Sequence, residues 1–293
     1  MNDFNTFVVL LGGITFVFGL CSKWLSASPF PPTLLALFVG IALGPELLNL
    51  VNLEELGDRS SILEKAARLT IGIGLVGVAL RIPRMFIHKN WRGLLLLIGA
   101  GMVLMWAIST LLVYFVLGVS FWMAALLGAI ITPTDPVAAS PIVTGSVAER
   151  NIPERMRDSI SFESGANDGL GYLFVFLPFL MLTRPPDEAL IQWLVTTFLW
   201  HVLGATLFGL LLGYAAGKLL QAADRNDSIQ PHWRLVYTVA LALLAVGVGR
   251  LLQSDEILVA FAAGAMFVQV VTKEERENED FGQEAVNRFF AIP

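Results

Sequence analysis

Two short polar stretches, each inside a long apolar segment, carry the side chains of this sequence that could do chemistry. TPTDPVAASP at residues 132–141 places Asp135 among hydroxyl groups and prolines, and FESGANDGLG at residues 162–171 contains Glu163 and Asp168. A carboxylate at the centre of a bilayer costs about 2.5–3.5 kcal/mol on insertion scales. Because of this cost, an ionisable residue within a membrane segment indicates a functional site by default.

The first stretch contains three prolines within nine residues, which predicts a broken helix near residues 132–141. These prolines are Pro133, Pro136 and Pro141. Each removes a backbone donor and clashes with the carbonyl one turn earlier. In lipid, the freed backbone groups are tolerated only where protein or a watery cavity satisfies them. Thr132 and Thr134 supply hydroxyls at the break, and Asp135 supplies a charge. Two interpretations stay open: an ion site at the helix ends, or a kink whose exposed helix ends Asp135 neutralises.

The second stretch places four polar side chains on neighbouring faces of a predicted helix. Ser164 and Asp168 are four residues apart and share one face. Glu163 and Asn167 share the adjacent face. Hydroxyl, amide and carboxylate oxygens suit a hard cation, whereas zinc or copper would need Cys or His nearby. The alternative is a buried polar network that only stabilises the fold. We favour that alternative for Glu163 alone and a functional role for Asp168.

Small residues indicate where neighbouring helices approach one another closely. Ser161, Gly165 and Gly169 recur every four residues beside the polar faces, which predicts that a second helix packs tightly there. GIGLVG at residues 72–77 matches the G-x-G-x-x-G of dinucleotide-binding proteins in letters only, because no strand precedes it and it lies inside an apolar span. We interpret its glycines as helix contacts as well.

The composition indicates an all-α polytopic membrane protein. Hydrophobic residues make up 56% of the 293 residues and charged residues 15%, whereas soluble domains average about 45–50% and about 25%. About 20 apolar residues cross a bilayer, so the sequence predicts about nine transmembrane helices. They are expected at 4–22, 32–50, 62–82, 91–118, 121–143, 154–182, 190–220, 233–252 and 256–271. The net charge of −5, without a basic patch, argues against nucleic acid as a partner.

The distribution of Lys and Arg predicts the orientation in the membrane. Connections after odd-numbered spans hold fourteen of these residues, and the N-terminus and even-numbered connections hold three. Since cytoplasmic loops carry the excess of positive charge, the N-terminus is expected outside the cell (inner) membrane. No Lys or Arg precedes the span at 4–22, so we interpret it as an uncleaved first helix and not as a signal peptide.

Two further polar features inside the spans have simpler interpretations. Glu64, Lys65 and Arg68 open the third span, where an interfacial ion-pair cluster is the favoured reading, although Glu64 could line an entrance. His201 lies within the seventh span, and we favour a core histidine with satisfied nitrogens over a pH sensor.

The two polar stretches together resemble the NhaP-type monovalent cation/proton antiporters of the sodium/hydrogen exchanger family. The match consists of TDPVAA at 134–139 followed by ES-x-x-ND at 163–168, supported by LFVGIALGP at 37–45 and ILVAFAAGAMF at 257–267. The resemblance runs along essentially the whole chain. It implies an inverted-repeat fold of about thirteen spans, a homodimer with a mobile core, and a transporter without cofactor instead of an enzyme. Residues 1–293 would then be the N-terminal portion of one transmembrane transport domain, without a soluble domain.

The resemblance also implies the central role in transport. Asp168 corresponds to the aspartate that carries either a proton or the cation, with Na⁺ the first expectation and Li⁺ and K⁺ open. Asn167 beside it marks the branch associated with electroneutral exchange. A cation channel, or a fragment or scaffold that does not transport, remain the alternatives.

The same resemblance assigns supporting roles to the remaining polar residues. Thr134 and Ser164 would contribute oxygen ligands to the cation. Asp135 would lie at the crossing of two unwound helices and balance their dipoles. Glu163 would pair with an arginine from a helix expected beyond residue 293.

Overall fold

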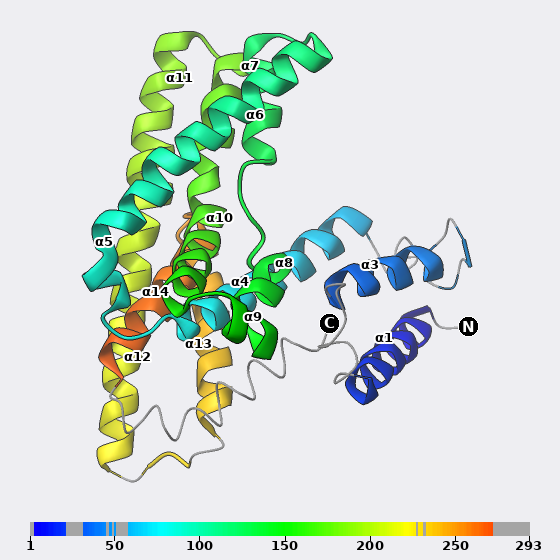
Figure 1. Ribbon diagram of the computed structural model, residues 1–293, viewed down its shortest axis with the longest axis vertical. Helices are drawn as coiled ribbons and strands as arrows, with labels where there is room; N and C mark the ends of the chain where they lie inside the picture. The colour runs from blue at the N-terminus through cyan, green and yellow to red at the C-terminus, as the bar shows by residue number, and fades with distance from the viewer. Residues whose placement is uncertain are drawn as a thin grey trace. The chain divides into compact units, whose positions relative to one another are not determined.

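Every regular element in the described part of the chain is a helix, as the composition predicts (Figure 1). The computed structural model of the protein describes residues 3–21, 32–44, 47–48, 50, 58–226, 228–230 and 233–271. These residues fall into two compact units, which divide between Thr70 and Ile71.

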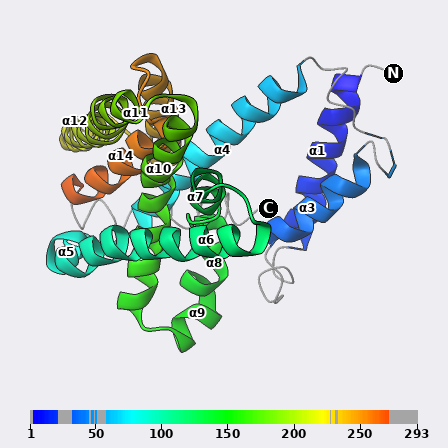
Figure 2. The same cartoon turned by 90° about the horizontal axis from the view of Figure 1, so that it is seen from above.

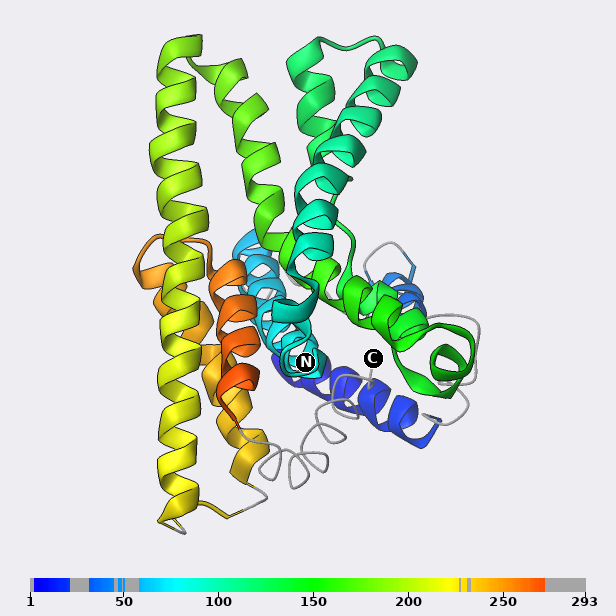
Figure 3. The same cartoon turned by 60° about the vertical axis from the view of Figure 1, so that its left-hand side comes forward.

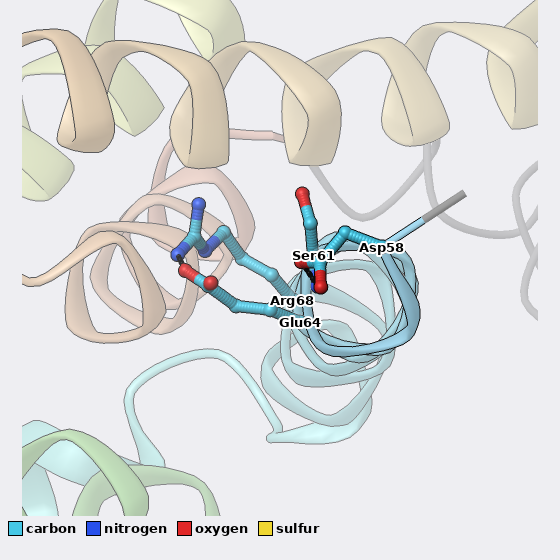
Figure 4. A network of polar contacts seen from close by, with 4 residues as sticks. All are labelled: Asp58, Ser61, Glu64 and Arg68. Carbon is cyan, nitrogen blue, oxygen red and sulfur yellow. Dashed lines mark hydrogen bonds and ion pairs between the residues drawn. The ribbon is translucent and has the colours of Figure 1, made fainter. Parts of the chain in front are cut away.

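The first unit contains α1 (Asp3–Leu20), α3 (Pro32–Leu43) and the beginning of α4 (Arg59–Arg81). At the start of α4, the Asp58 carboxylate accepts a hydrogen bond of 2.8 Å from the backbone N–H of Ser61 (Figure 4). Glu64 and Arg68 form an ion pair one turn apart on the same helix. The ion pair predicted for this end of the third span is confirmed for these two residues.

The second unit holds the rest of α4 and the remaining helices. Two long helical stretches of this unit, at 86–117 and 186–225, each contain a π-helical segment without a break in the helix. The elements are α5 (Phe86–Leu96), η2 (Leu97–Gly101), α6 (Met102–Leu117), α7 (Phe121–Ile130), α8 (Pro136–Val143), α9 (Gly145–Asn151), α10 (Glu154–Thr183), α11 (Pro186–Gln192), η3 (Trp193–Gly204), α12 (Ala205–Arg225), α13 (Trp233–Leu251) and α14 (Glu256–Val270).

Each of the nine predicted spans overlaps a helix of the described residues, which confirms an all-α polytopic architecture. Four helical stretches are long and apolar enough to cross a membrane: Phe86–Leu117, Glu154–Thr183, Pro186–Arg225 and Trp233–Leu251. The fourth span begins at Phe86, five residues before its predicted start, because the polar residues around Lys89 occupy a regular helical turn. The number of spans stays a prediction.

Within the second unit, α10 is the central element. It contacts α7 and α8 on one side and η3, α11 and α14 on the other. Figures 2 and 3 show α10 between the hairpin of α6 and α7 and the group formed by α12, α13 and α14. The second polar stretch lies on α10, so the side chains it carries can reach both groups of helices.

A row of glycines joins α12 to α14. Gly209, Gly213 and Gly217 recur every four residues and are buried against α14. A Cβ atom at Gly213 would overlap the backbone of Ala263. The two helices can therefore approach this closely only because position 213 has no side chain. The interface continues into an apolar core that includes Phe267.

The glycines of residues 72–77 lie inside α4, so the nucleotide-binding reading is excluded there, as predicted. A Cβ atom at Gly72 would overlap the Val246 side chain of α13. This glycine therefore acts as a helix contact.

Candidate functional site

The first polar stretch interrupts the helix where it was expected to. α7 ends at Ile130, residues 131–135 are not helical, and α8 begins at Pro136. Pro136 suits the first helical turn, where the missing N–H would have no partner anyway. The break is shorter than the predicted 132–141, because Pro141 lies inside α8. Pro141 removes one hydrogen bond of this short helix, which ends two residues later at Val143.

A compact set of hydrogen bonds joins this break to α10. The Asn167 amide donates to the Thr134 hydroxyl at 2.8 Å and to the Glu163 carboxylate at 2.7 Å. The Thr134 hydroxyl donates to the other oxygen of Glu163 at 3.1 Å. Asn167 is fully buried, with 0% of its surface exposed, and Glu163 is buried as well. We call Thr134, Glu163 and Asn167 the polar triangle.

The polar triangle confirms part of the spacing argument. Glu163 and Asn167, four residues apart on α10, do share a face and are hydrogen-bonded to each other. In the described part of the chain, the partners of the Glu163 carboxylate are Thr134 and Asn167. The Oδ1 atom of Asn167 is buried and makes no hydrogen bond within the described residues.

Ser164 and Asp168 occupy the neighbouring face of α10. The Ser164 hydroxyl is buried and donates to the Ile160 carbonyl at 2.9 Å, so only its lone pairs are available for another partner. Asp168 is half-buried, and the charges that act on it are those of Asp135, Asp255 and Glu163. A half-buried carboxylate among other acidic groups attracts a cation or a proton.

Asp135 stands directly before α8. Its carboxylate lies 3.4 Å from the backbone N–H of Ala138, and its carbonyl accepts from Ala139 N–H. It therefore serves the exposed beginning of α8, where negative charge is favourable. This position agrees with a carboxylate that balances a helix end. It is compatible both with an ion site at the helix break and with a kink that Asp135 only stabilises.

The predicted small-residue stripe is where α14 meets α10. A Cβ atom at Gly165 would overlap the Phe261 ring, and one at Gly169 would lie 2.7 Å from the Leu258 Cβ. On another side of α10, a Cβ at Gly171 would lie 2.8 Å from Pro133 Cγ. The close packing predicted from spacing is confirmed, and the helix break is held against the same helix.

Sequence reasoning missed one buried carboxylate, that of Asp255. It caps α14 by accepting hydrogen bonds of 3.0 Å from the backbone N–H groups of Ile257 and Leu258. Only 7% of its surface is exposed, and its charge acts on Asp168. The available signal was an Asp directly before an apolar helical run, which is the usual N-cap pattern. An N-cap pattern does not show that the charge of this carboxylate acts on Asp168 of α10.

The comparison with known families decides the classification. The sequence matches the family described as "Sodium/hydrogen exchanger, transmembrane" over residues 8–293. The chain belongs to the sodium/hydrogen exchanger family. The resemblance inferred from the two polar stretches is thereby confirmed, and the matched region includes the break, the polar triangle and Asp168.

Individual relatives of this exchanger chain carry antiporter names. It is 32% identical to Na(+)/H(+) antiporter 2 of Zygosaccharomyces rouxii over 80% of the chain and 29% of the relative. It is 32% identical to the Na(+)/H(+) antiporter of Saccharomyces cerevisiae over 78% of the chain and 23% of the relative. It is 29% identical to the Na(+)/H(+) antiporter NhaP of Pseudomonas aeruginosa over 36% of the chain and 24% of the relative. The chain thus spans less than a third of the length of each.

Proposed function

We propose that the protein exchanges a monovalent cation, Na⁺ first, for H⁺ across the cell membrane as a secondary active transporter. The observation that carries this proposal is the half-buried Asp168 next to a broken membrane helix, in a chain of the sodium/hydrogen exchanger family. Broken helices with ionisable side chains are how many secondary transporters build ion sites. Relatives named Na(+)/H(+) antiporters support the same cargo.

In this mechanism one carboxylate binds either H⁺ or the cation, but not both. Asp168 takes the ion, and oxygens from Thr134 and the lone pairs of Ser164 complete its surroundings. Because Asp168 is neutralised by one H⁺ or by one Na⁺, exchange is one for one and electroneutral. The fully buried Asn167 adds no second titrating group.

The remaining residues keep the break in register with α10 during this exchange. Glu163 and Asn167 hold Thr134 through the polar triangle, and Asp135 stabilises the start of α8. We place the working protein as a homodimer in the cell membrane with its N-terminus outside. The basic connections then face the cytoplasm.

The decisive experiment measures Na⁺-induced pH changes in proteoliposomes that contain the full-length protein from its natural reading frame. Asp168→Asn keeps size and hydrogen-bonding capacity but removes the titrating charge, so we expect exchange to be abolished while membrane insertion is retained. Asp187→Asn is the matched control, because Asp187 is exposed in the first turn of α11, and it should exchange like the wild type. Wild-type exchange by Asp168→Asn would overturn the proposal.

The same preparation separates the antiporter from a cation channel. An antiporter moves protons in the direction opposite to Na⁺, whether the Na⁺ gradient points inward or outward. A channel carries Na⁺ without changing the internal pH. Na⁺ flux that persists without any proton movement would therefore replace the proposed function by conduction.

A further inference from the structure

Three elements meet directly after Asp168 on α10. Gly169 brings α10 into close contact with Leu258 at the start of α14. The Ser254 hydroxyl, in the turn between α13 and α14, donates to the Trp200 carbonyl of η3 at 3.2 Å. The Trp200 indole in turn donates to the backbone carbonyl of the same turn at 3.1 Å. The turn before α14 is thus fixed to η3, and the first turn of α14 lies against α10 next to Asp168.

Two aromatic side chains face each other at this junction. Tyr172 lies four residues after Asp168 and therefore on the same face of α10. Its ring is 5.1 Å from the ring of His201 on η3, centroid to centroid, and 4.1 Å from the stacked ring of Phe176. The Tyr172 ring thus contacts Phe176 of its own helix and His201 of η3.

The polar atoms of this aromatic pair are open. Neither the Tyr172 hydroxyl nor the His201 imidazole forms a hydrogen bond with another described residue. Neither group is among the fully buried, unpaired polar atoms of the described residues. Both residues are half-buried. A hydroxyl and an imidazole can each hold a water molecule or lend an oxygen or nitrogen lone pair to a passing cation.

Charged groups from the adjoining helices surround the pair. Asp255 and Glu256 at the start of α14 act on Tyr172 together with Arg250 from the end of α13, and Glu256 acts on His201. Asp255 also acts on Asp168. Three carboxylates, those of Glu256, Asp255 and Asp168, outnumber the single guanidinium of Arg250. Since acidic groups raise the local concentration of cations, this balance favours the approach of positive charge.

We propose that Tyr172 and His201 form a gate through which cation and proton reach Asp168 from the side of the turn between α13 and α14. The inference rests on the proposed function, because it needs Asp168 as the destination. The rings block the direct approach when they are in contact, and their polar atoms replace part of the hydration shell when an ion passes between them. A purely structural aromatic contact would require the rings and not their polar atoms.

That difference defines the variants. Tyr172→Phe and His201→Phe keep an aromatic ring at each position and remove the hydroxyl or the imidazole nitrogens. A barrier on the access route changes the rates of binding and release together, so equilibrium binding should stay the same. We expect the double variant to lower kcat/KM for Na⁺ about tenfold and to change Kd for Na⁺ by less than about twofold. His201→Gln, which restores polar atoms, should recover part of the rate.

The measurements are initial rates of Na⁺-induced pH change in proteoliposomes and equilibrium binding of radioactive sodium to the purified full-length protein. Leu203→Ala is the matched control, since Leu203 is an exposed residue of the same π-helical segment, and it should behave as the wild type. If the double variant is too unstable to purify, each single variant, expected to lower kcat/KM about threefold, carries the test.

The outcomes separate the two proposals. Loss of Na⁺ binding in step with the loss of rate would make the pair ligands of the ion and overturn the gate. If the wild type exchanges and the double variant exchanges at the same rate, the gate is overturned as well. A wild type that binds no Na⁺ and moves no protons, or an active Asp168→Asn variant, would instead refute the function on which the gate rests.

Discussion

Asn167 takes the most enclosed position among the polar residues of α10, and its amide satisfies two acceptors at once. Its N–H groups point to Thr134 and Glu163 at 2.8 Å and 2.7 Å. An amide cannot take up a proton in this place, which fits the proposed mechanism, in which Asp168 alone binds one proton or one cation. The residue therefore offers a direct test of electroneutrality.

Asn167→Asp replaces the amide donor by a second carboxylate within hydrogen-bond distance of Glu163. Two carboxylates at this separation share one proton. Release of that proton during the cycle would leave a net charge to move, so we expect reduced but measurable exchange that responds to voltage. An imposed potential of about 100 mV is worth about 2.3 kcal/mol per charge moved across the full membrane, enough to change the rate severalfold. The measurement is exchange in proteoliposomes with a potassium diffusion potential.

Asn151→Asp is the control for this substitution, because Asn151 is exposed at the end of α9 and bonded only to its own helix within the described residues. It should remain insensitive to voltage. If Asn167→Asp exchanges without any response to voltage, Asn167 does not set the stoichiometry.

At the residue scale, helical spacing predicted which side chains of α10 share a face, and the Asn167–Glu163 hydrogen bond confirms it. Spacing along one helix says nothing about side chains from elsewhere in the chain. The contribution of Thr134 to the polar triangle and the influence of the Asp255 charge on Asp168 therefore became visible only in the fold. Ser164 shows the same limit, because its hydroxyl donates to its own helix.

At the scale of elements, close packing of α12 on α14 depends on the absence of side chains at three positions. Gly213→Ala would place a methyl group against the backbone of Ala263, which cannot move aside as a flexible side chain can. Overpacking of this kind destabilises by about 1–3 kcal/mol, so we expect a lower midpoint of thermal unfolding for the purified protein. Asp255 caps α14 and Leu258 lies in its first turn, so Na⁺ binding should weaken as the helices separate.

Gly247→Ala provides the comparison. Gly247 lies inside α13 with open space around its Cα, so the added methyl group meets nothing within 4 Å. Alanine favours the helix over glycine by about 0.5–1 kcal/mol, and the unfolding midpoint should stay the same or rise slightly. Equal losses for both variants would show that the glycine row on α12 has no special role in packing.

The elements themselves were largely predictable, since apolar runs of suitable length each yielded a helix. The proline cluster predicted a break in the fifth span, but not its extent. Pro136 is compatible with the first turn of a helix and Pro141 with its last turns, so only residues 131–135 lost helical structure. The π-helical segments η2 and η3 were not predicted, because apolar periodicity hardly distinguishes a π-helix from an α-helix.

At the scale of the whole molecule, the charges at the two ends of α10 predict its orientation in the membrane. The helix has 30 residues and, at about 1.5 Å per residue, is about 45 Å long, which exceeds the hydrocarbon thickness of about 30 Å. Arg150, Arg155 and Arg157 lie around its beginning, whereas its end is followed by one basic residue, Arg184, and by the acidic Asp187 and Glu188. The positive-inside rule then predicts that the beginning of α10 lies in the cytoplasm and its end outside.

Cysteine labelling tests this orientation, and with it the external N-terminus. The chain has one cysteine, Cys21, which Cys21→Ser removes. In that background, Asp187→Cys should react with a membrane-impermeant maleimide in intact cells, and Glu149→Cys only after permeabilisation, because both positions are exposed but lie at opposite ends of α10. Inside-out vesicles should reverse the pattern. Labelling of Glu149→Cys alone in intact cells would invert the topology, and labelling of neither before permeabilisation would place the protein away from the cell surface.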